Sequence, residues 1–233
     1  MGIQKYIVAS VVGIGICLLS ASVCQADVLY QSATSSSSTN SGVAIGGGNA
    51  AAGIQSQYVG VRFEVLDPVI VDAVGGNFSM DAIQQSPAGL FAELVSLGSA
   101  TDFPSATDGA STDTDAIAFT TFTVSNSVAS DITLPILPRE LMPGWYALTF
   151  GPQSSSSSLR ATASSSNMDV DTPSFITRHA GTSWYNDSPG LNERFYIIAA
   201  PLPGVAGSAV VFLAVMGTAR IARQRFTGAT PSN

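Results

Sequence analysis

Apolar and polar side chains alternate with a period of two along much of this chain, and this pattern constrains its fold more than any other feature. In residues 59–65 every second side chain is apolar, and Gly60, Arg62 and Glu64 stand between them. Successive side chains of a strand point to opposite faces of a sheet. The segment is therefore predicted to be a strand with one buried face.

The same alternation predicts strands through the middle of the chain, at residues 69–74, 89–97, 117–124, 131–136, 145–150, 174–177, 183–185 and 194–198. Turn residues separate them, at Asp67-Pro68, Gly75-Gly76-Asn77, Met142-Pro143-Gly144 and Ser188-Pro189-Gly190. No stretch has a helical period over three turns. We therefore expect an all-β fold, a single antiparallel β-sandwich of jelly-roll-like kind. Greek-key jelly-roll and immunoglobulin-like strand orders both stay open.

Small and polar residues dominate residues 32–52, 154–158 and 164–166. These segments have little apolar area to offset the entropy lost when a chain is ordered. We expect solvated loops there, or a loosely paired strand within residues 32–52.

The N-terminus has the pattern of a secretory signal peptide. Lys5 precedes an uncharged apolar run at residues 7–19, and small residues then lead to a cleavage position after Ala26. A membrane-spanning helix is the alternative, but about 13 apolar residues fall short of the roughly 20 that cross a bilayer. Cys24, just past the apolar run, also leaves a lipid-attachment site open.

Cysteine and charge both separate the ends of the chain from its middle. Cys17 and Cys24 lie in the predicted signal peptide, so the mature protein has no thiol for a disulfide, a metal site or a nucleophile. From Asp27 to Arg194 the chain has all 16 acidic residues against five arginines, a formal charge of −11. Because such an acidic body repels phosphate backbones, we expect no nucleic-acid partner.

A long uncharged stretch ends in arginines near the C-terminus. No charge occurs between Arg194 and Arg220, and a helix over residues 205–222 would span about 27 Å at 1.5 Å per residue. Arginine stems that reach the interface would close the gap to a hydrocarbon core of about 30 Å. We expect a transmembrane helix with its C-terminus in the cytoplasm. A buried core helix is the alternative.

The same segment carries a short motif: Pro201, Leu202, Pro203 and Gly204 precede the apolar run, and Arg220, Arg223 and Arg225 follow it. In order and spacing, residues 201–225 resemble the tail of the PEP-CTERM family of bacterial surface proteins, with Leu202 where the named motif has glutamate. The resemblance implies recognition by a membrane-embedded cysteine protease of the exosortase type, which removes the tail and passes the protein outward.

These segments predict four regions in the chain. They are a signal peptide (1–26), a β-sandwich ectodomain (27–200), a sorting and transmembrane segment (201–225) and a short cytoplasmic tail (226–233). The 174 residues of the ectodomain are enough for one domain with a sizeable core.

Residues suited to catalysis are scarce. A Ser-His-Asp triad would have to use His179, the single histidine, and no Gly-x-Ser-x-Gly turn accompanies the serines. Glu64 and Glu93 lie on the outward faces of their predicted strands, which is the ordinary place for a solvated glutamate. We expect no catalytic residue and no enzymatic activity.

Two groups of aspartates suit a calcium ion. The first group spans residues 102–115, from Asp102 to Asp115, and contains Asp108 and Asp113. Asp169 and Asp171 form the second group. Calcium takes about six to eight oxygen ligands, several of which clustered carboxylates supply. The bidentate glutamate that ends a twelve-residue calcium loop is missing, so a solvated acidic loop is the other interpretation.

Trp184 lies in a segment rich in Gly, Ser and Pro. An aromatic ring on such a loop can stack on a sugar ring, and it can also pack into a core.

Two functions follow from these observations. The first is a non-enzymatic surface or matrix protein whose β-sandwich serves structure or adhesion. The second is a carbohydrate-binding module, with or without calcium, and an extracellular hydrolase is less favoured. An exposed aromatic beside acidic residues on one concave face would indicate binding, whereas a featureless surface would indicate a structural role.

Overall fold

The computed structural model describes residues 27–34, 42–47, 56–82, 86–105, 115–154, 159–164, 174–180, 182–187 and 193–200. They belong to one compact unit, Ala26–Ala200. The predicted cleavage residue Ala26 and the predicted sorting segment 201–225 lie outside the described residues. In the part of the chain that is described, no helix has the length and apolar character needed to span a membrane.

The prediction of an all-β fold is confirmed for the described residues. The strands are β1 (Asp27–Gln31), β2 (Gly42–Gly46), β3 (Gln57–Val65), β4 (Val69–Met80), β5 (Ala88–Leu97), β6 (Ala116–Val124), β7 (Ser130–Leu141), β8 (Gly144–Pro152), β9 (Arg160–Ser164), β10 (Ser174–His179), β11 (Tyr185–Asn186) and β12 (Phe195–Ala199). Each predicted strand overlaps one of these.

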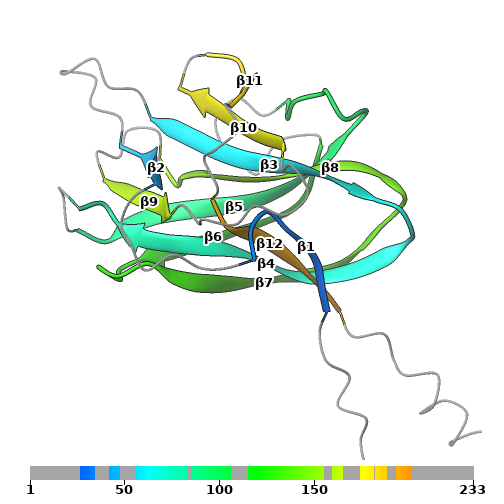
Figure 1. Cartoon of the computed structure of the whole chain (residues 1–233), viewed down its shortest axis with the longest axis horizontal. Coiled ribbons are helices and arrows are strands. Elements are labelled where there is room, and N and C mark those ends of the chain that lie inside the picture. Colours follow the sequence, from blue (N-terminus) through cyan, green and yellow to red (C-terminus); the bar gives the residue numbers. More distant parts are fainter. Residues whose placement is uncertain are drawn as a thin grey trace, which may run out of the picture. The chain divides into compact units, whose positions relative to one another are not determined.

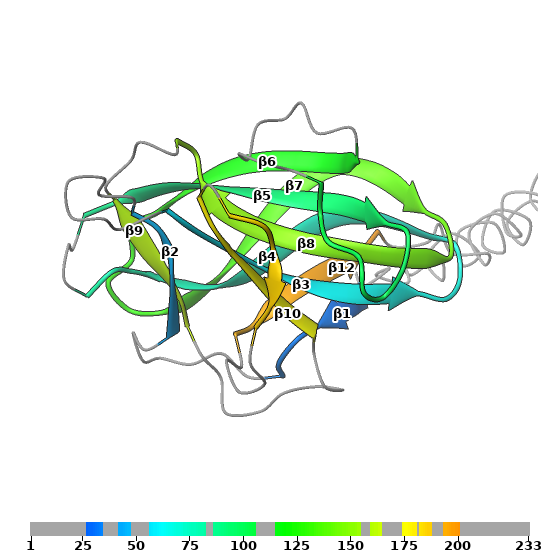
Figure 2. The same cartoon turned by 90° about the horizontal axis from the view of Figure 1, so that it is seen from above.

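The strands form one antiparallel sheet, drawn from two sides in Figures 1 and 2. Its order is β1-β12-β4-β9-β2-β3-β8-β5-β6, while β7 pairs with β4, and β10 pairs with β3 and β11. Most neighbours in this order are far apart in the sequence. Long-range pairing therefore builds the sheet, and the first and last strands lie side by side within it.

The main core contains aromatic rings from strands that do not pair with each other. Phe78 of β4 lies edge-on to Phe150 of β8, with ring centroids 5.0 Å apart, and Phe195 of β12 stacks on Phe150 at 4.9 Å. Phe122 of β6 and Phe175 of β10 complete this cluster, which we call the phenylalanine core. Side chains of β4 and β12 thus pack against those of β6, β8 and β10.

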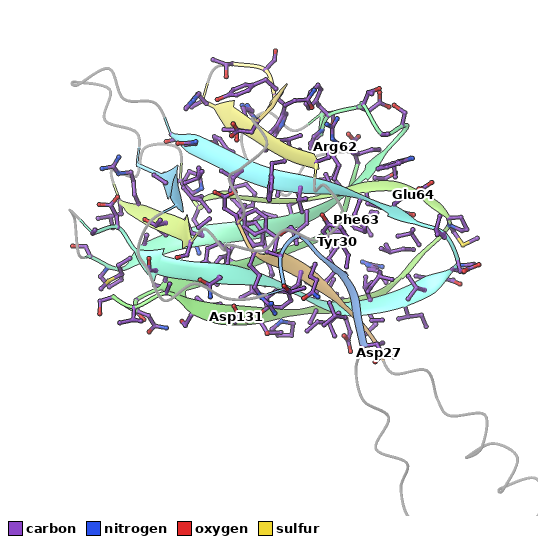
Figure 3. The ribbon with its side chains drawn as sticks, in the orientation of Figure 1. Asp27, Tyr30, Arg62, Phe63, Glu64 and Asp131 are labelled. Carbon is purple, nitrogen blue, oxygen red and sulfur yellow. The ribbon has the colours of Figure 1, made fainter. Side chains whose placement is uncertain are left out.

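The alternation in β3 has the predicted direction. The apolar side chains of β3 are buried in the main core, and Figure 3 shows Tyr30 of β1 against Phe63, with ring centroids 5.1 Å apart. On the opposite face Glu64 is exposed, but Arg62 is buried. The second face of β3 is therefore covered over part of its length.

The turn predicted at Gly75-Gly76-Asn77 is wrong, because these residues continue β4. A Cβ atom on Gly75 would come within 2.5 Å of the Tyr196 ring, and one on Gly76 within 2.7 Å of the Phe78 ring. The glycines let aromatic side chains of β4 and β12 approach the strand backbone, which is a reason for glycine inside a strand.

One strand lies where small residues predicted a loop or a loosely paired strand, and its partner lies between two predicted loops, where no strand was predicted. β2 lies within residues 32–52 and pairs with β9 over its whole length, and β9 ends at Ser164. Ile45, Ala161 and Ala163 from these strands are fully buried in the main core. Pairing between these two strands, which are far apart in the sequence, buries the small apolar side chains. The local sequence pattern shows this only weakly.

Residues 27–200 are expected to fold alone, giving a β-type circular dichroism spectrum that reductant does not change, since this fragment has no cysteine. Within the fragment, Phe150→Ala should lower the free energy of unfolding by about 3–5 kcal/mol, because it leaves a cavity where Phe78 and Phe195 meet. Denaturant unfolding followed by circular dichroism measures the loss.

Leu137→Ala is the matched control, because Leu137 is 75% exposed and such surface changes usually stay within about 0.5 kcal/mol. A helical or unfolded spectrum for the wild-type fragment would contradict the fold. Equal losses in the two variants would contradict the assignment of the core.

Candidate functional site

A second apolar cluster lies on the face of β5 and β8 opposite the phenylalanine core. Its buried members are Val95, Leu97, Ala147 and Ile176, and the half-buried rings of Phe103, Trp145 and Trp184 pack against them. Phe103 comes from the segment after β5, and Trp184 from the segment before β11. These two segments cover the outer face of the sheet, and we call the group the outer cluster.

Arg62 ties the covering segments to the sheet. Its Nη1 donates to the carbonyl oxygen of Asp102 (3.2 Å), its Nη2 to Asn186 Oδ1 (2.5 Å), and its Nε and Nη2 both donate to Ser174 Oγ (3.0 and 2.7 Å). The guanidinium carbon also lies 5.1 Å from the centroid of the Phe103 ring. Arg62 is only 6% exposed; burial lowers its pKa, and the charge of Asp102 opposes that shift.

An open cavity of about 760 Å³ lies beside the outer cluster, between the end of β5 and the start of β6. Asp102 and Asp115 line it, together with the apolar residues Leu97, Phe103 and Ile117. It therefore combines acidic oxygen acceptors with an aromatic wall. Such a surface can accept hydrogen bonds from hydroxyl groups while apolar parts of a ligand contact the ring.

A main-chain amide holds the Asp115 carboxylate, and Asp102 is held through its backbone. Asp115 Oδ2 accepts a hydrogen bond from the Ser105 amide (3.3 Å), and the Asp115 carbonyl accepts one from Ser96 (3.1 Å). Gly98 makes room for Asp102, since a Cβ atom there would lie 2.6 Å from Asp102 Oδ2. Arg62 holds the Asp102 backbone from behind.

Of the aspartates predicted to bind calcium, Asp115 lies in this cavity. Asp108 and Asp113, like Asp169 and Asp171, lie outside the described residues. Within the described ranges, no three His, Cys, Asp or Glu side chains come together as a metal site. The acidic partner that the structure places beside Asp115 is Asp102.

Trp184 packs against the outer cluster, and the exposed ring of that segment is its neighbour Tyr185. Tyr185 stacks on His179 and its hydroxyl lies 3.1 Å from His179 Nε2. Burial raises the pKa of Tyr185, and the charge of Asp187 adds to the rise. Asp187 in turn accepts a hydrogen bond from the Thr177 hydroxyl, which anchors the segment to β10.

The prediction of a solvated Glu93 is wrong. Its side chain leaves β5 on the outward face, as expected, but it is only 1% exposed. Local alternation assigns a side chain to a face and does not show whether other segments cover that face. Glu193 is also buried, whereas Glu64 and Glu140 are exposed.

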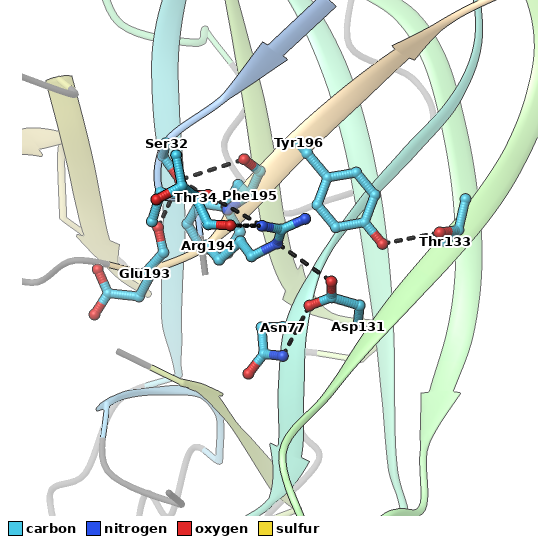
Figure 4. A network of polar contacts seen from close by, with 10 residues as sticks. Ser32, Thr34, Asn77, Asp131, Thr133, Glu193, Arg194, Phe195 and Tyr196 are labelled. Atoms are coloured by element: carbon cyan, nitrogen blue, oxygen red, sulfur yellow. Dashed lines mark hydrogen bonds and ion pairs between the residues drawn. The ribbon is translucent and has the colours of Figure 1, made fainter. Parts of the chain in front are cut away.

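A second polar network joins the two ends of the described chain (Figure 4). Ser32 Oγ accepts a hydrogen bond from the Phe195 amide (2.7 Å) and donates one to the Glu193 carbonyl oxygen (2.5 Å). Arg194 Nη1 donates to the Thr34 carbonyl (2.8 Å), and Arg194 Nε forms an ion pair with Asp131 Oδ2 at 3.3 Å. We call this network the terminal clasp, because it fixes the chain after β1 to the start of β12.

Two neighbours extend the terminal clasp towards β4 and β7. Asn77 Nδ2 donates to Asp131 Oδ1 (2.8 Å), and the Tyr196 hydroxyl bonds to Thr133 Oγ1 (2.9 Å) beneath the Arg194 guanidinium. Burial raises the pKa of the Tyr196 phenol, and the hydrogen bond to Thr133 opposes the rise.

Sequence reasoning included Asp102 as the first residue of the acidic cluster 102–115, but it missed Arg62 and Phe103 as parts of a site. The alternation in β3 correctly placed the Arg62 side chain on the face of the strand opposite the main core. Its partners come from residues that are 40, 112 and 124 positions away, and such pairings leave no local pattern.

Comparisons of the chain with protein-family models, with curated proteins and with solved structures give no match.

The calcium hypothesis for Asp108, Asp113 and Asp115 predicts that millimolar calcium raises the melting temperature of the protein more than magnesium does. A ligand that binds only the folded state at a hundredfold excess over Kd stabilises it by about 2.7 kcal/mol. The double variant Asp113→Asn, Asp115→Asn should lose the calcium shift. Thermal unfolding followed by circular dichroism measures it.

Asn at position 115 keeps an oxygen that can accept the hydrogen bond from Ser105, so the double variant should retain the wild-type spectrum. Equal shifts with calcium and magnesium, or a calcium shift that survives in the double variant, would leave these aspartates as a solvated acidic loop.

Proposed function

We propose that this chain is an exported bacterial surface or matrix protein. In this proposal a signal peptide directs export, and a non-catalytic β-sandwich ectodomain is held at the membrane by the C-terminal segment. An exosortase-type protease then reads Pro201, Leu202, Pro203 and Gly204 with the following arginines, and removes the tail.

The observation that carries this proposal is the register of the first and last strands. β1 begins at Asp27, directly after the predicted cleavage at Ala26, and Asp27 pairs with Ala199 at the end of β12. Ala200, the next residue, donates its amide to the Ile70 carbonyl (2.8 Å). The two predicted terminal segments thus begin at neighbouring residues, and removal of either would leave every described strand at full length.

The contacts of the phenylalanine core support the β-sandwich. Phe78 and Phe195 come from β4 and β12, and Phe122 and Phe150 come from β6 and β8. When two layers of strands pack face to face, as in a sandwich, rings from strands that are not paired with each other come into contact. The order of the strands, in which sequence neighbours are often separated, supports a jelly-roll-like path.

Intact-mass measurement on protein from the cell envelope and the culture medium tests the proposal. The mature chain should lack Met1–Ala26, and part of it should also lack the region beyond Pro203. Deletion of residues 201–233 should release the protein to the medium, because the membrane segment is then missing. Deletion of residues 226–233 is the control that keeps all the predicted sorting residues. A full-length cytosolic chain as the main species would refute export.

Carbohydrate binding is the second candidate function, and the acidic cavity favours it. Asp102 and Asp115 offer carboxylate oxygens to sugar hydroxyls, and Phe103 offers an aromatic wall on the same concave surface. The ligand in this proposal is an extracellular polysaccharide. Trp184 would support it from the outer cluster, on which it packs.

A glycan array probed with residues 27–200 should identify a bound sugar, and Asp102→Asn should then weaken its binding roughly tenfold or more, since hydrogen bonds to charged groups contribute about 1.5–3 kcal/mol. Calorimetric titration measures the change. Asp67→Asn, at an exposed carboxylate in the β3–β4 turn, is the matched control. An array without bound glycans, or equal affinities for the two variants, would remove this candidate.

A further inference from the structure

Exposed apolar side chains gather at one end of the sheet. The turn from β3 to β4 presents Leu66, which is 74% exposed, and the turn from β7 to β8 presents Met142, which is 57% exposed. The two turns are neighbours, because Val65 pairs with Gly144 and Val69 with Leu141. Figures 1 and 2 both show them at the same end of the sheet. Ile70, also exposed, follows on β4.

The last strand runs towards this end. β12 is antiparallel to β4, and its final residue Ala199 pairs with Val71, near the start of β4. Ala200 then bonds to the carbonyl of Ile70. The predicted membrane segment therefore leaves the domain next to an exposed apolar residue, within about four residues of Leu66.

The connection between the domain and the predicted membrane segment is short. Residues 201–204 separate Ala200 from the apolar run that begins at Val205. At no more than about 3.6 Å per residue, Val205 lies within roughly 18 Å of Ala200. The headgroup layer of a bilayer is about 5–8 Å deep on each side. With the segment inserted, this end of the domain is close enough to reach the lipid surface.

We propose that Leu66, Ile70 and Met142 form a lipid-contacting surface that rests on the outer leaflet while the C-terminal segment anchors the chain. This inference rests on the proposed anchor. Apolar side chains on turns can enter the interface between headgroups and acyl chains, and each one buried there removes apolar area from water. The contact would hold the domain in one orientation on the membrane before the tail is removed.

Charges around the surface specify the kind of lipid. Asp27, Glu64, Asp67 and Glu140 are exposed at this end of the sheet, with Arg139 as the neighbouring cation. Anionic lipids would repel this carboxylate rim. The partner is therefore a zwitterionic lipid surface, and contact should weaken when anionic lipid is added and recover partly with salt.

Fluorescence quenching in vesicles tests the proposal with the full chain. Cys17→Ser and Cys24→Ser remove the native thiols, and Leu66→Cys, Met142→Cys or Val128→Cys then introduces a single labelling site for an environment-sensitive dye. The chain is reconstituted in phosphatidylcholine vesicles with a quencher on part of the lipid. Val128 is the matched control, because it is 60% exposed and precedes Ser130 at the opposite end of β7.

Dyes at positions 66 and 142 are expected to emit at shorter wavelength and to lose intensity with the quencher, while a dye at position 128 stays unchanged. A chain that floats with the vesicles but shows no quenching at 66 and 142, or equal quenching at all three positions, would overturn the lipid-contacting surface and leave the anchor intact. A chain that does not float with the vesicles would overturn the anchor, and the lipid contact with it.

Discussion

The packing of Phe195 against Phe78 and Phe150 is the interaction on which the rest of the structure depends. It brings the last strand, β12, into the main core between side chains of β4 and β8. The approach is close enough that β4 needs glycine at positions 75 and 76. With β12 fixed, β1 gains its only pairing partner among the described strands, and the terminal clasp then joins Ser32 and Arg194. The ends of the domain are thus held by its core.

The opposite face of the sheet is organised by a charged residue. The guanidinium of Arg62 is buried beneath the segment after β5 and the segment around β11, where Asp102, Ser174 and Asn186 accept its hydrogen bonds. Hydrogen bonding offsets the cost of burying the charge, which otherwise is large. A hydrophobic side chain at this position could pack on Phe103 but could not hold the Asp102 backbone. The shape of the acidic cavity therefore depends on Arg62, although Arg62 is not among its lining residues.

Local pattern predicted the strands well where large apolar residues alternate, as in β3, β5, β6 and β8. It predicted no strand at β9 and left a loop or a loosely paired strand open at β2. The small side chains of these two strands are buried where the strands pair with each other. It also failed at Gly75 and Gly76, where clearance for rings, and not a turn, requires glycine. Of the acidic cavity, Asp102 and Asp115 were anticipated, as the first and last residues of the predicted acidic cluster. Phe103 contacts Arg62 of β3, and local alternation does not show that Glu93 is buried, so no local signal could identify these two roles.

The position of β12 also limits where the chain can be cut. Phe195 and Ile197 are fully buried, and Ala200 still bonds to Ile70. A cut before Phe195 would remove a ring from the phenylalanine core and leave β1 and one edge of β4 unpaired, whereas a cut after Ala200 removes no described contact. The predicted motif begins at Pro201, the first residue beyond this limit. Proline has no amide hydrogen, so it cannot extend the hydrogen-bonded ladder of β12. The predicted sorting segment thus begins directly after the described strands, and the described domain is complete without it.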